Sequence, residues 1–471
     1  MMEDRATLLA RLTAAVGPRH VLTDDADTAP WLTDWRGRFR GRALAVVRPA
    51  STAEAAAVVR ACADAGAPVV PQGGNTGLCG GATPDATGTA VVVALTRMHA
   101  IRGLDAANAT ITVEAGATLA AVHDAATAAG FRFPLSLASE GSCTVGGNLS
   151  TNAGGTAVLR YGNMRELVLG LEVVLADGNV LPALRGLRKD NTGYDLKQLF
   201  VGAEGTLGLI TAATLKLFPM PSVQVTAFAA LDSPRHAVAL LGRMQRALSD
   251  RLTGFEAIGA EALALCRTHY PALPDPLPGH RWFVLIQADD SAPGSALGAA
   301  VEAALGAALE DGTAADALVA GSGAQAQALW ALRENISDAQ KNEGPNIKHD
   351  ISLPVSAIPD FLDVARVELD VALPGVRYIV FGHLGDGNLH YNLSPPAGVS
   401  HGDFLTNGDL ANRIVHDLVA ARGGSFSAEH GIGQLKRAEL ERYKSPVELE
   451  TMRRIKAALD PAGVFNPGKV I

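Results

Sequence analysis

The sequence predicts an α+β protein built of two lobes. The chain has 471 residues, more than a single hydrophobic core usually accommodates. Short β-branched runs alternate with alanine-rich stretches and glycine clusters between residues 43 and 218, and longer helical stretches separate the strands that follow. This order lacks the regular strand-helix-strand alternation of a doubly wound sheet. We therefore expect two different lobes, joined near residues 219–221, where two prolines flank Met220.

The first lobe is predicted from its strands. Runs rich in Val, Ile and Thr between turn residues are typical of buried strands. At the N-terminus, residues 1–17 predict an amphipathic helix, because charges interrupt the apolar positions. The predicted strands of this lobe are residues 43–49, 67–71, 89–95, 109–116, 171–178 and 207–219.

A hairpin over residues 377–393 is the most informative prediction in the second lobe. Gly-Asp-Gly-Asn at 385–388 tolerates tight reversal, so a four-residue turn would pair His383 with His390 and Leu384 with Leu389. Residues opposite one another share a face, with Cβ atoms about 5 Å apart. The two imidazoles could therefore bind one ion, or be solvated histidines near a turn. The other predicted elements are strands at 223–231 and 281–289 and helices near 234–249, 295–310 and 324–342.

Charge and cysteine content exclude several classes of protein. The formal net charge is −8 and no basic run is present, which argues against a nucleic-acid partner. The four cysteines are widely spaced without a C-x-x-C pair, which argues against a disulfide framework or a zinc knuckle. No apolar stretch reaches the ~20 residues that span a bilayer, and the N-terminus lacks the apolar core of a signal peptide. We expect a soluble protein in the reducing cytoplasm.

Two glycine-rich loops, residues 71–81 and 140–155, stand out in the first lobe. Neither carries the Gly-Lys-Ser/Thr of a P-loop, and neither is expected to open a helix as a dinucleotide fingerprint does. Glycine lets backbone N–H groups approach an anion, while Asn and Thr add neutral donors, so a diphosphate can be held by dipoles. Either loop alone could be a simple connection. Both together favour a phosphate cradle.

With these loops, further motifs resemble the FAD-linked 2-hydroxyacid dehydrogenases of the vanillyl-alcohol-oxidase superfamily, in particular those that act on D-2-hydroxyglutarate. The resemblance runs from about residue 31 to the end. It implies a vanillyl-alcohol-oxidase-type FAD-binding domain (1–220), an inserted mixed α/β substrate or cap domain (221–425), and a C-terminal segment (426–471) that returns to the FAD domain and active site. The motifs are LRYGN, GLEVVLADG, RKDNTGYDLKQLF, VGAEGTLGLIT, GHLGDGNLHYN, AEHGIG and LDPAGVFNPGK.

The resemblance implies a non-covalent FAD. Some relatives attach the flavin through a histidine of the first loop, and Asn75 and its neighbours offer none. Cys143 is expected to be a buried structural thiol. Residues of the two loops would grip the diphosphate and ribityl chain, Glu204 and Ile210 would lie beside the nucleotide, and Asn466 near the flavin ring. The implied loop residues are Pro71, Gly73, Gly74, Asn75, Thr76, Gly77, Leu78, Gly141, Ser142, Thr144, Gly147, Asn148, Thr151, Asn152 and Gly154.

A divalent metal is also implied, held by His383, His390 and Glu429. Zinc is the expected ion, although the same ligands suit manganese or iron. It would orient the substrate carboxylate and α-hydroxyl. His430 would take the hydroxyl proton and contact the substrate while C2 passes a hydride to flavin N5. Gly431 would let the backbone bend so that both neighbours reach one site.

Four further residues would bind the substrate. Arg333 and Ser337 are four residues apart in a predicted helix, Lys348 lies on a predicted strand over 346–354, and Asn392 lies on the same side of its strand as His390. From composition alone, Arg333 would be an ordinary surface ion-pair residue. The resemblance implies that Arg333, Ser337 and Lys348 hold a distal carboxylate. Relatives have Thr at the position of Ser337, so glutarate, malate and lactate skeletons stay open.

The leading hypothesis is thus a metal-assisted, FAD-dependent dehydrogenase of a D-2-hydroxy dicarboxylate such as D-2-hydroxyglutarate or D-malate. The alternatives are a D-lactate or glycolate dehydrogenase of the same fold, and a non-catalytic flavin- or metal-binding protein. Besides the small 2-hydroxy acid, the expected partners are an electron acceptor such as an electron-transfer flavoprotein and a second copy in a homodimer.

Overall fold

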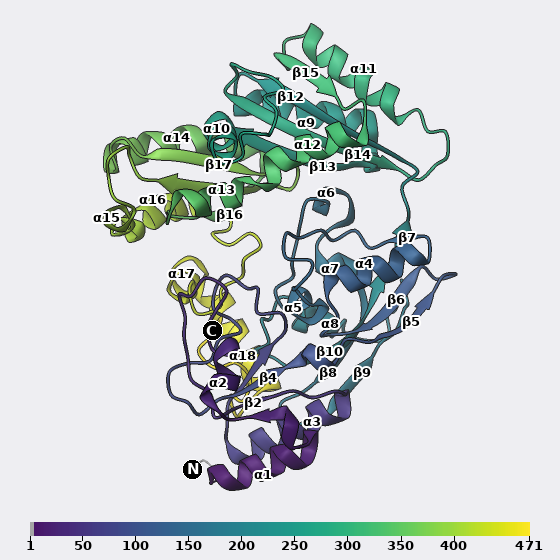
Figure 1. Ribbon diagram of the computed structural model, residues 1–471, viewed down its shortest axis with the longest axis vertical. Helices are drawn as coiled ribbons and strands as arrows, with labels where there is room; N and C mark the ends of the chain where they lie inside the picture. Colours follow the sequence, from purple (N-terminus) through teal and green to yellow (C-terminus); the bar gives the residue numbers. More distant parts are fainter. Residues whose placement is uncertain (1–3) are drawn as a thin grey trace. The chain divides into compact units, whose positions relative to one another are not determined.

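The computed structural model describes residues 4–471, which form two compact units (Figure 1). The first unit contains the residues up to Gly154, then Gly162–Met220 and Glu429–Ile471. The second contains Gly155–Tyr161 and Pro221–Ala428. Both units mix helices and strands, which confirms the α+β class.

The first unit contains a four-stranded sheet and a five-stranded sheet. In the four-stranded sheet, the order is β1-β2-β4-β3, and β2 and β3 both run parallel to β4. The five-stranded sheet is antiparallel, in the order β5-β6-β10-β8-β9. A short pair, β7 (Phe131–Arg132) and β11 (Phe218–Pro219), completes the strands. The bounds are β1 Val21–Leu22, β2 Ala45–Val47, β3 Val69–Gln72, β4 Val91–Ala94, β5 Ile101–Asp105, β6 Thr110–Glu114, β8 Val168–Val174, β9 Val180–Ala183 and β10 Leu209–Lys216.

The predicted strands of this unit are confirmed, but β5 and β9 had no clear sequence signal. Both are edge strands of their sheet, and most of their residues are not buried. β9 also contains Pro182. Proline has no N–H group to donate, and an edge strand tolerates it because one side of the strand has no neighbouring strand to pair with. Exposed edges lack the apolar alternation by which strands are predicted.

The helices of the first unit are mostly short. The predicted N-terminal helix is α1, whose buried Leu8, Leu12 and Val16 follow the helical period; residues 1–3 of that prediction lie outside the described chain. A helix also begins inside the second glycine loop, contrary to expectation: Thr144 accepts from Gly147 N and caps α5. The bounds are α1 Arg5–Val16, α2 Asp25–Thr28, α3 Thr52–Ala65, α4 Leu119–Ala128, α5 Val145–Ser150, α7 Met164–Leu167, α8 Lys197–Phe200, α17 Arg437–Tyr443 and α18 Pro446–Leu459.

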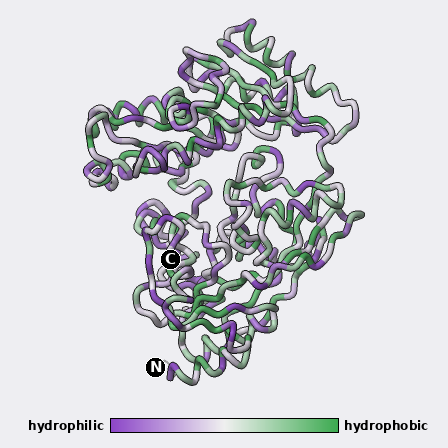
Figure 2. Tube along the Cα trace, in the orientation of Figure 1, coloured by the Kyte–Doolittle hydropathy of each residue, from purple (hydrophilic) through white to green (hydrophobic). Residues whose placement is uncertain are grey.

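The second unit is built on one seven-stranded antiparallel sheet, β15-β12-β14-β13-β17-β18-β16. Helices α9, α11, α14 and α16 cover one face, and α10, α12 and α13 cover the other. The strands are therefore buried on both faces, and apolar stretches run along them in Figure 2. The strand bounds are β12 Val223–Leu231, β13 Leu252–Gly259, β14 Trp282–Asp290, β15 Asp316–Val319, β16 Asp350–Ser352, β17 Arg377–His383 and β18 Asn388–Ser394.

The predicted helix over 324–342 is two helices. Asn335 separates them: its ψ is −4°, and its side-chain amide donates to Ala331 O at 2.8 Å. Arg333 and Ser337 consequently lie on different helices. The helices of this unit are α6 Val158–Tyr161, α9 Pro234–Leu248, α10 Ala260–His269, α11 Leu297–Glu310, α12 Gly323–Glu334, α13 Ile336–Glu343, α14 Ile358–Ala372, α15 His401–Leu405 and α16 Gly408–Ala421.

The predicted hairpin forms, but the predicted register differs from the observed one by two residues. His390 of β18 lies opposite Phe381, because residues 384–386 form a 3-10 turn and Gly387, with φ +86°, ends it. His383 pairs across the other side of β17, with Glu256 of β13. An even shift keeps side chains on the same face, so His383 and His390 remain neighbours. The predicted strand over 346–354 is also shorter, since β16 begins at Asp350 and Lys348 precedes it.

All four cysteines lie in the described part of the chain, are buried and carry free thiols. Between residues 4 and 471, no helix combines the length and the apolar character needed to cross a membrane.

Candidate active site

The two glycine loops of the first unit pack against each other. A Cβ atom on Gly73 would lie 2.2 Å from Thr144 Oγ1, and one on Gly74 would lie 1.9 Å from Ser142 O. No side chain fits at either position. Asn75 follows with φ +52°, and its Nδ2 donates to Thr33 O at 2.8 Å. Close contacts that only glycine permits at positions 73 and 74 thus bring these parts of the two loops together.

Other parts of the loops border open space. A Cβ atom on Gly77 or Gly141 would meet no described atom within 4 Å. Thr76 and Leu78 are half-buried, whereas Gly141 and Ser142 are exposed. Exposed backbone at tight glycine turns is what a flavin diphosphate needs in order to bind through N–H groups. These loops fit the expected cofactor.

The remaining residues of the second loop hold its shape. Thr151 Oγ1 donates to Gly147 O at 3.0 Å, and Asn152, with φ +51°, accepts from Arg165 N at 2.9 Å. Cys143 is buried and its sulfur lies 3.5 Å from Asn148 Nδ2. Gly154 is buried at the end of the loop, and Pro71 packs in β3 beside Gly205.

Glu204 holds the segment that follows His430. Its carboxylate accepts from Ile432 N at 2.7 Å and from Gly433 N at 2.8 Å. Burial raises its pKa above the ordinary value, although these two bonds act in the opposite direction. Sequence reasoning expected Glu204 beside the nucleotide and gave no sign of this contact. Ile210, with the same expectation, is a buried residue of β10 opposite Val173.

Asn466 carries a buried acceptor. Its Nδ2 donates to Gly81 O at 2.9 Å and to Glu204 O at 2.8 Å. Its Oδ1 is buried and has no hydrogen-bond partner among the described residues. An orphaned acceptor is costly, so this position is consistent with a polar group of a bound cofactor.

A row of polar side chains crosses the sheet of the second unit, on the face that α12 covers. Glu256 of β13 lies opposite His383 of β17, and Asp350 of β16 lies opposite His390 of β18. His390 also packs on Phe381, with ring centroids 4.9 Å apart. Since partners across an antiparallel ladder share a face, these side chains gather without being neighbours in sequence.

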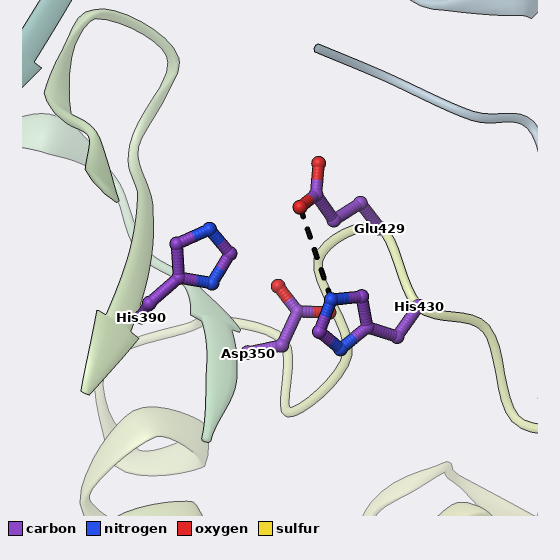
Figure 3. A group of neighbouring side chains, drawn as sticks. All are labelled: Asp350, His390, Glu429 and His430. Carbon is purple, nitrogen blue, oxygen red and sulfur yellow. Dashed lines mark ion pairs between the residues drawn. The ribbon is translucent and has the colours of Figure 1, made fainter. Parts of the chain in front are cut away.

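Four side chains form a group that could bind a metal: Asp350, His390, Glu429 and His430 (Figure 3). One ligand atom from each lies within 4.8 Å of the others, and His430 Nε2 is 3.9 Å from a Glu429 oxygen. Residues 429 and 430 directly follow Ala428, whose N–H donates to Asp350 O at 3.1 Å. Two imidazoles with two carboxylates are a donor set that suits zinc, manganese or iron.

His383, the third predicted metal ligand, is not in that group. Its ring lies edge-on to His390, with centroids 5.8 Å apart, and its Nδ1 is 2.7 Å from Glu256 Oε1. A carboxylate only accepts hydrogen bonds, so Nδ1 is a protonated nitrogen in this contact, which leaves Nε2 for other contacts.

The predicted substrate residues have different surroundings. Arg333 is buried, its Nε donates to Glu256 at 2.8 Å, and its guanidinium lies 4.7 Å above the Phe381 ring. The expectation of a surface ion pair is therefore wrong. Asn392 is buried and bonded to Gln340 and His349 N, whereas Ser337 is exposed and Lys348 half-buried.

Glu256 and Asp350 were missed by sequence reasoning. The available signal was a single carboxylate within a buried apolar strand, as in GFEAIG, since such residues are rarely buried unless paired.

Comparison with known proteins identifies the class. Residues 43–183 match the family described as "FAD binding domain", and residues 220–470 match "FAD linked oxidases, C-terminal domain". Among solved structures, p-cresol methylhydroxylase superposes with a TM-score of 0.77 at 16% identity, covering 99% of this chain and 96% of the other. For 4-ethylphenol oxidase from Gulosibacter chungangensis the TM-score is 0.74 at 20% identity, with the same coverage. The two family matches thus define an FAD-dependent oxidoreductase, and the solved structures agree with them in fold.

Full-length relatives with known names show which members of this family the chain resembles. "D-2-hydroxyglutarate dehydrogenase, mitochondrial" from Bos taurus is 39% identical over 469 residues, covering 98% of this chain and 83% of the relative. "D-2-hydroxyglutarate dehydrogenase" from Xanthomonas citri pv. viticola is 38% identical over 461 residues, covering 98% of this chain and 96% of the relative. The chain belongs to the FAD-linked oxidase family, together with these dehydrogenases.

Proposed function

We propose that the chain oxidises D-2-hydroxyglutarate, or a similar D-2-hydroxy dicarboxylate such as D-malate, to the 2-oxo acid. The observation that carries the proposal is the buried Arg333 of α12, whose guanidinium packs over Phe381 on the sheet face that also carries His383 and His390. Arg333 pairs with Glu256, and its planar guanidinium has several donors, so one group can serve both Glu256 and a substrate carboxylate. The substrate named for the relatives above agrees with this choice.

In the proposed reaction, His383, His390 and Glu429 hold a divalent metal, with zinc as our candidate. The metal supplies a Lewis acid for the α-hydroxyl, and FAD supplies the hydride acceptor at N5. His430 removes the hydroxyl proton. Arg333, Ser337 and Lys348 orient the distal carboxylate, and Asn392 helps to fix the substrate beside His390.

The group in Figure 3 supports a second ligand set, in which Asp350 takes the place of His383. Metal content separates the two sets. Loss of bound zinc in His383→Ala with retention in Asp350→Asn supports the first set, and the reverse result supports the second.

The substrate is tested by comparing kcat/KM for D-2-hydroxyglutarate, D-malate and D-lactate, with L-2-hydroxyglutarate as the stereochemical control. We expect a dicarboxylate of the D series to be preferred. Preference for D-lactate would replace the proposal with a monocarboxylate dehydrogenase of the same fold.

The proposal extends to the surroundings of the enzyme. Reduced flavin must be reoxidised, and our candidate acceptor is an electron-transfer flavoprotein. Four buried free thiols suit a reducing compartment, for which we propose the cytoplasm, with the enzyme as a homodimer. Sedimentation of the purified protein and turnover with an electron-transfer flavoprotein test these points.

A further inference from the structure

Glu256 is the most deeply buried carboxylate of the polar row. It lies in β13, where all eight residues are buried, and its own exposure is 1%. A carboxylate in such surroundings is costly unless it is paired and hydrogen-bonded. None of the sequence motifs includes it.

The two oxygens of this carboxylate serve two different groups. Oε1 is 2.7 Å from His383 Nδ1, and Oε2 accepts from Arg333 Nε at 2.8 Å. Burial acts to raise the pKa of Glu256, but His383 and Arg333 hold it below its ordinary value. Both oxygens of this buried carboxylate therefore have a hydrogen-bond partner in the same unit.

Each of these bonds fixes an orientation. Donation from Nδ1 sets the His383 tautomer and presents Nε2, which is how a carboxylate commonly supports a histidine that ligates a metal. Donation from Nε, together with contact on the Phe381 ring at 4.7 Å, fixes the guanidinium plane of Arg333. One side chain thus orients a candidate metal ligand and a candidate substrate-binding cation.

We infer that Glu256 is a positioning residue that links metal binding at His383 to recognition of the second substrate carboxylate by Arg333. The inference rests on the proposed function, because it takes His383 as a ligand and the substrate as a dicarboxylate. It adds that the two properties depend on one carboxylate. If the contacts of Glu256 were merely structural, a substitution of Glu256 would change the stability of the fold. Metal binding and the recognition of the second carboxylate would then stay unaltered.

The first variant for the test is Glu256→Gln, which keeps the size of the side chain but can accept from only one of its two partners. Zinc affinity is measured by competition with a chromophoric chelator, and kcat and KM are measured with D-2-hydroxyglutarate and D-lactate. We expect zinc affinity to fall about 10- to 100-fold. The preference for D-2-hydroxyglutarate over D-lactate should fall in the same variant, mainly through KM.

A matched control is Glu261→Gln. Glu261 of α10 is a partly exposed, ion-paired glutamate of the same unit that accepts from Tyr378 N at 2.9 Å and lies outside the polar row. The zinc affinity and the substrate preference of the Glu261→Gln variant should equal those of the unmodified protein. Glu256→Asp, which keeps the charge but shortens the reach, should give intermediate zinc affinity, and it decides the matter if Glu256→Gln does not fold.

A second measurement on the unmodified protein needs no Glu256 variant, and His383→Ala serves only to assign the resonance. In zinc-free protein with 15N-labelled histidine, the resonance lost in His383→Ala should be that of an Nδ1-protonated ring. An Nε2-protonated ring would overturn the inference.

Failure of the inference differs from failure of the proposed function. Unchanged zinc affinity and unchanged substrate preference in folded Glu256→Gln, with zinc lost in His383→Ala, would overturn the positioning role alone. If the unmodified protein binds no divalent metal and prefers D-lactate, the proposed function fails and the inference falls with it.

Discussion

Arg333 lies in the interior of the second unit, paired with Glu256 and packed on Phe381. Such a pair contributes little net stability, because desolvation offsets the attraction, but removing one partner leaves the other charge uncompensated. The contacts with Glu256 and Phe381 fix a buried guanidinium beside the sheet face that carries His383 and His390.

Arg333→Ala should lower kcat/KM for D-2-hydroxyglutarate roughly 10- to 150-fold, the scale of a lost charge-assisted hydrogen bond. D-lactate has no second carboxylate, so its kcat/KM should change little. Arg377→Ala, which removes a more exposed arginine paired with Glu343, is the control and should leave the ratio of the two substrates unchanged. Equal losses for both substrates would show that Arg333 supports the fold or the α-carboxylate instead.

His430→Ala should lower kcat by about 10²-fold or more while metal content is retained, since general-base catalysis typically contributes on this scale. Metal analysis is essential here, because His430 belongs to the group in Figure 3. Loss of the metal would make His430 a ligand, and an unchanged kcat would exclude it from the reaction.

At the scale of the elements, sequence predicted what depends on local pattern. The strands β2, β3, β4 and β6 were recognisable by their Val, Ile and Thr residues, and β12 by a long, mostly apolar run. The register of the hairpin depends on a 3-10 turn, and the division of the helical segment into α12 and α13 depends on one backbone angle at Asn335. Neither feature leaves a periodic signal in the sequence. The Glu256–His383 contact depends on β13 lying beside β17, a pairing of strands more than a hundred residues apart.

Helix α18 offers a test at this scale. Ser445 caps it by accepting from Glu448 N, while Glu448 accepts from Ser445 N. Ser445→Ala should reduce the free energy of unfolding by about 1 kcal/mol in denaturant titrations. A change within error would show that the last helix contributes nothing to the measured transition.

The pH dependence of this cap follows from Glu448. Its hydrogen bond from Lys444, with those from Ser445, lowers the pKa of Glu448 from its ordinary 4.5 to about 2. Because the folded pKa lies below the unfolded one, the contribution of Glu448 is complete above about pH 4.5 and is lost as the pH falls through 2. The effect of Ser445→Ala should therefore be the same at pH 7 and pH 5.

At the scale of the whole molecule, the candidate flavin loops and the candidate metal ligands belong to separate stretches of chain. The loops span residues 71–81 and 140–155, and the metal candidates lie at 350, 383, 390 and 429–430. The loop contacts of Gly73 with Thr144 and of Gly74 with Ser142 involve none of those residues.

Chelation should therefore abolish turnover and leave FAD bound. After dialysis against a chelator, we expect the flavin absorbance to remain with the protein and activity to return on addition of zinc. Release of FAD would show that the metal supports the flavin site, and full activity without metal would exclude it from the reaction.

The proposed dehydrogenase activity is tested most directly by anaerobic mixing of the FAD- and metal-loaded protein with D-2-hydroxyglutarate. Hydride transfer to flavin N5 should bleach the absorbance of the oxidised flavin in the D series and leave it unchanged with L-2-hydroxyglutarate. Flavin that stays oxidised in the presence of D-2-hydroxyglutarate, D-malate and D-lactate alike would contradict the account and indicate a protein that only binds flavin.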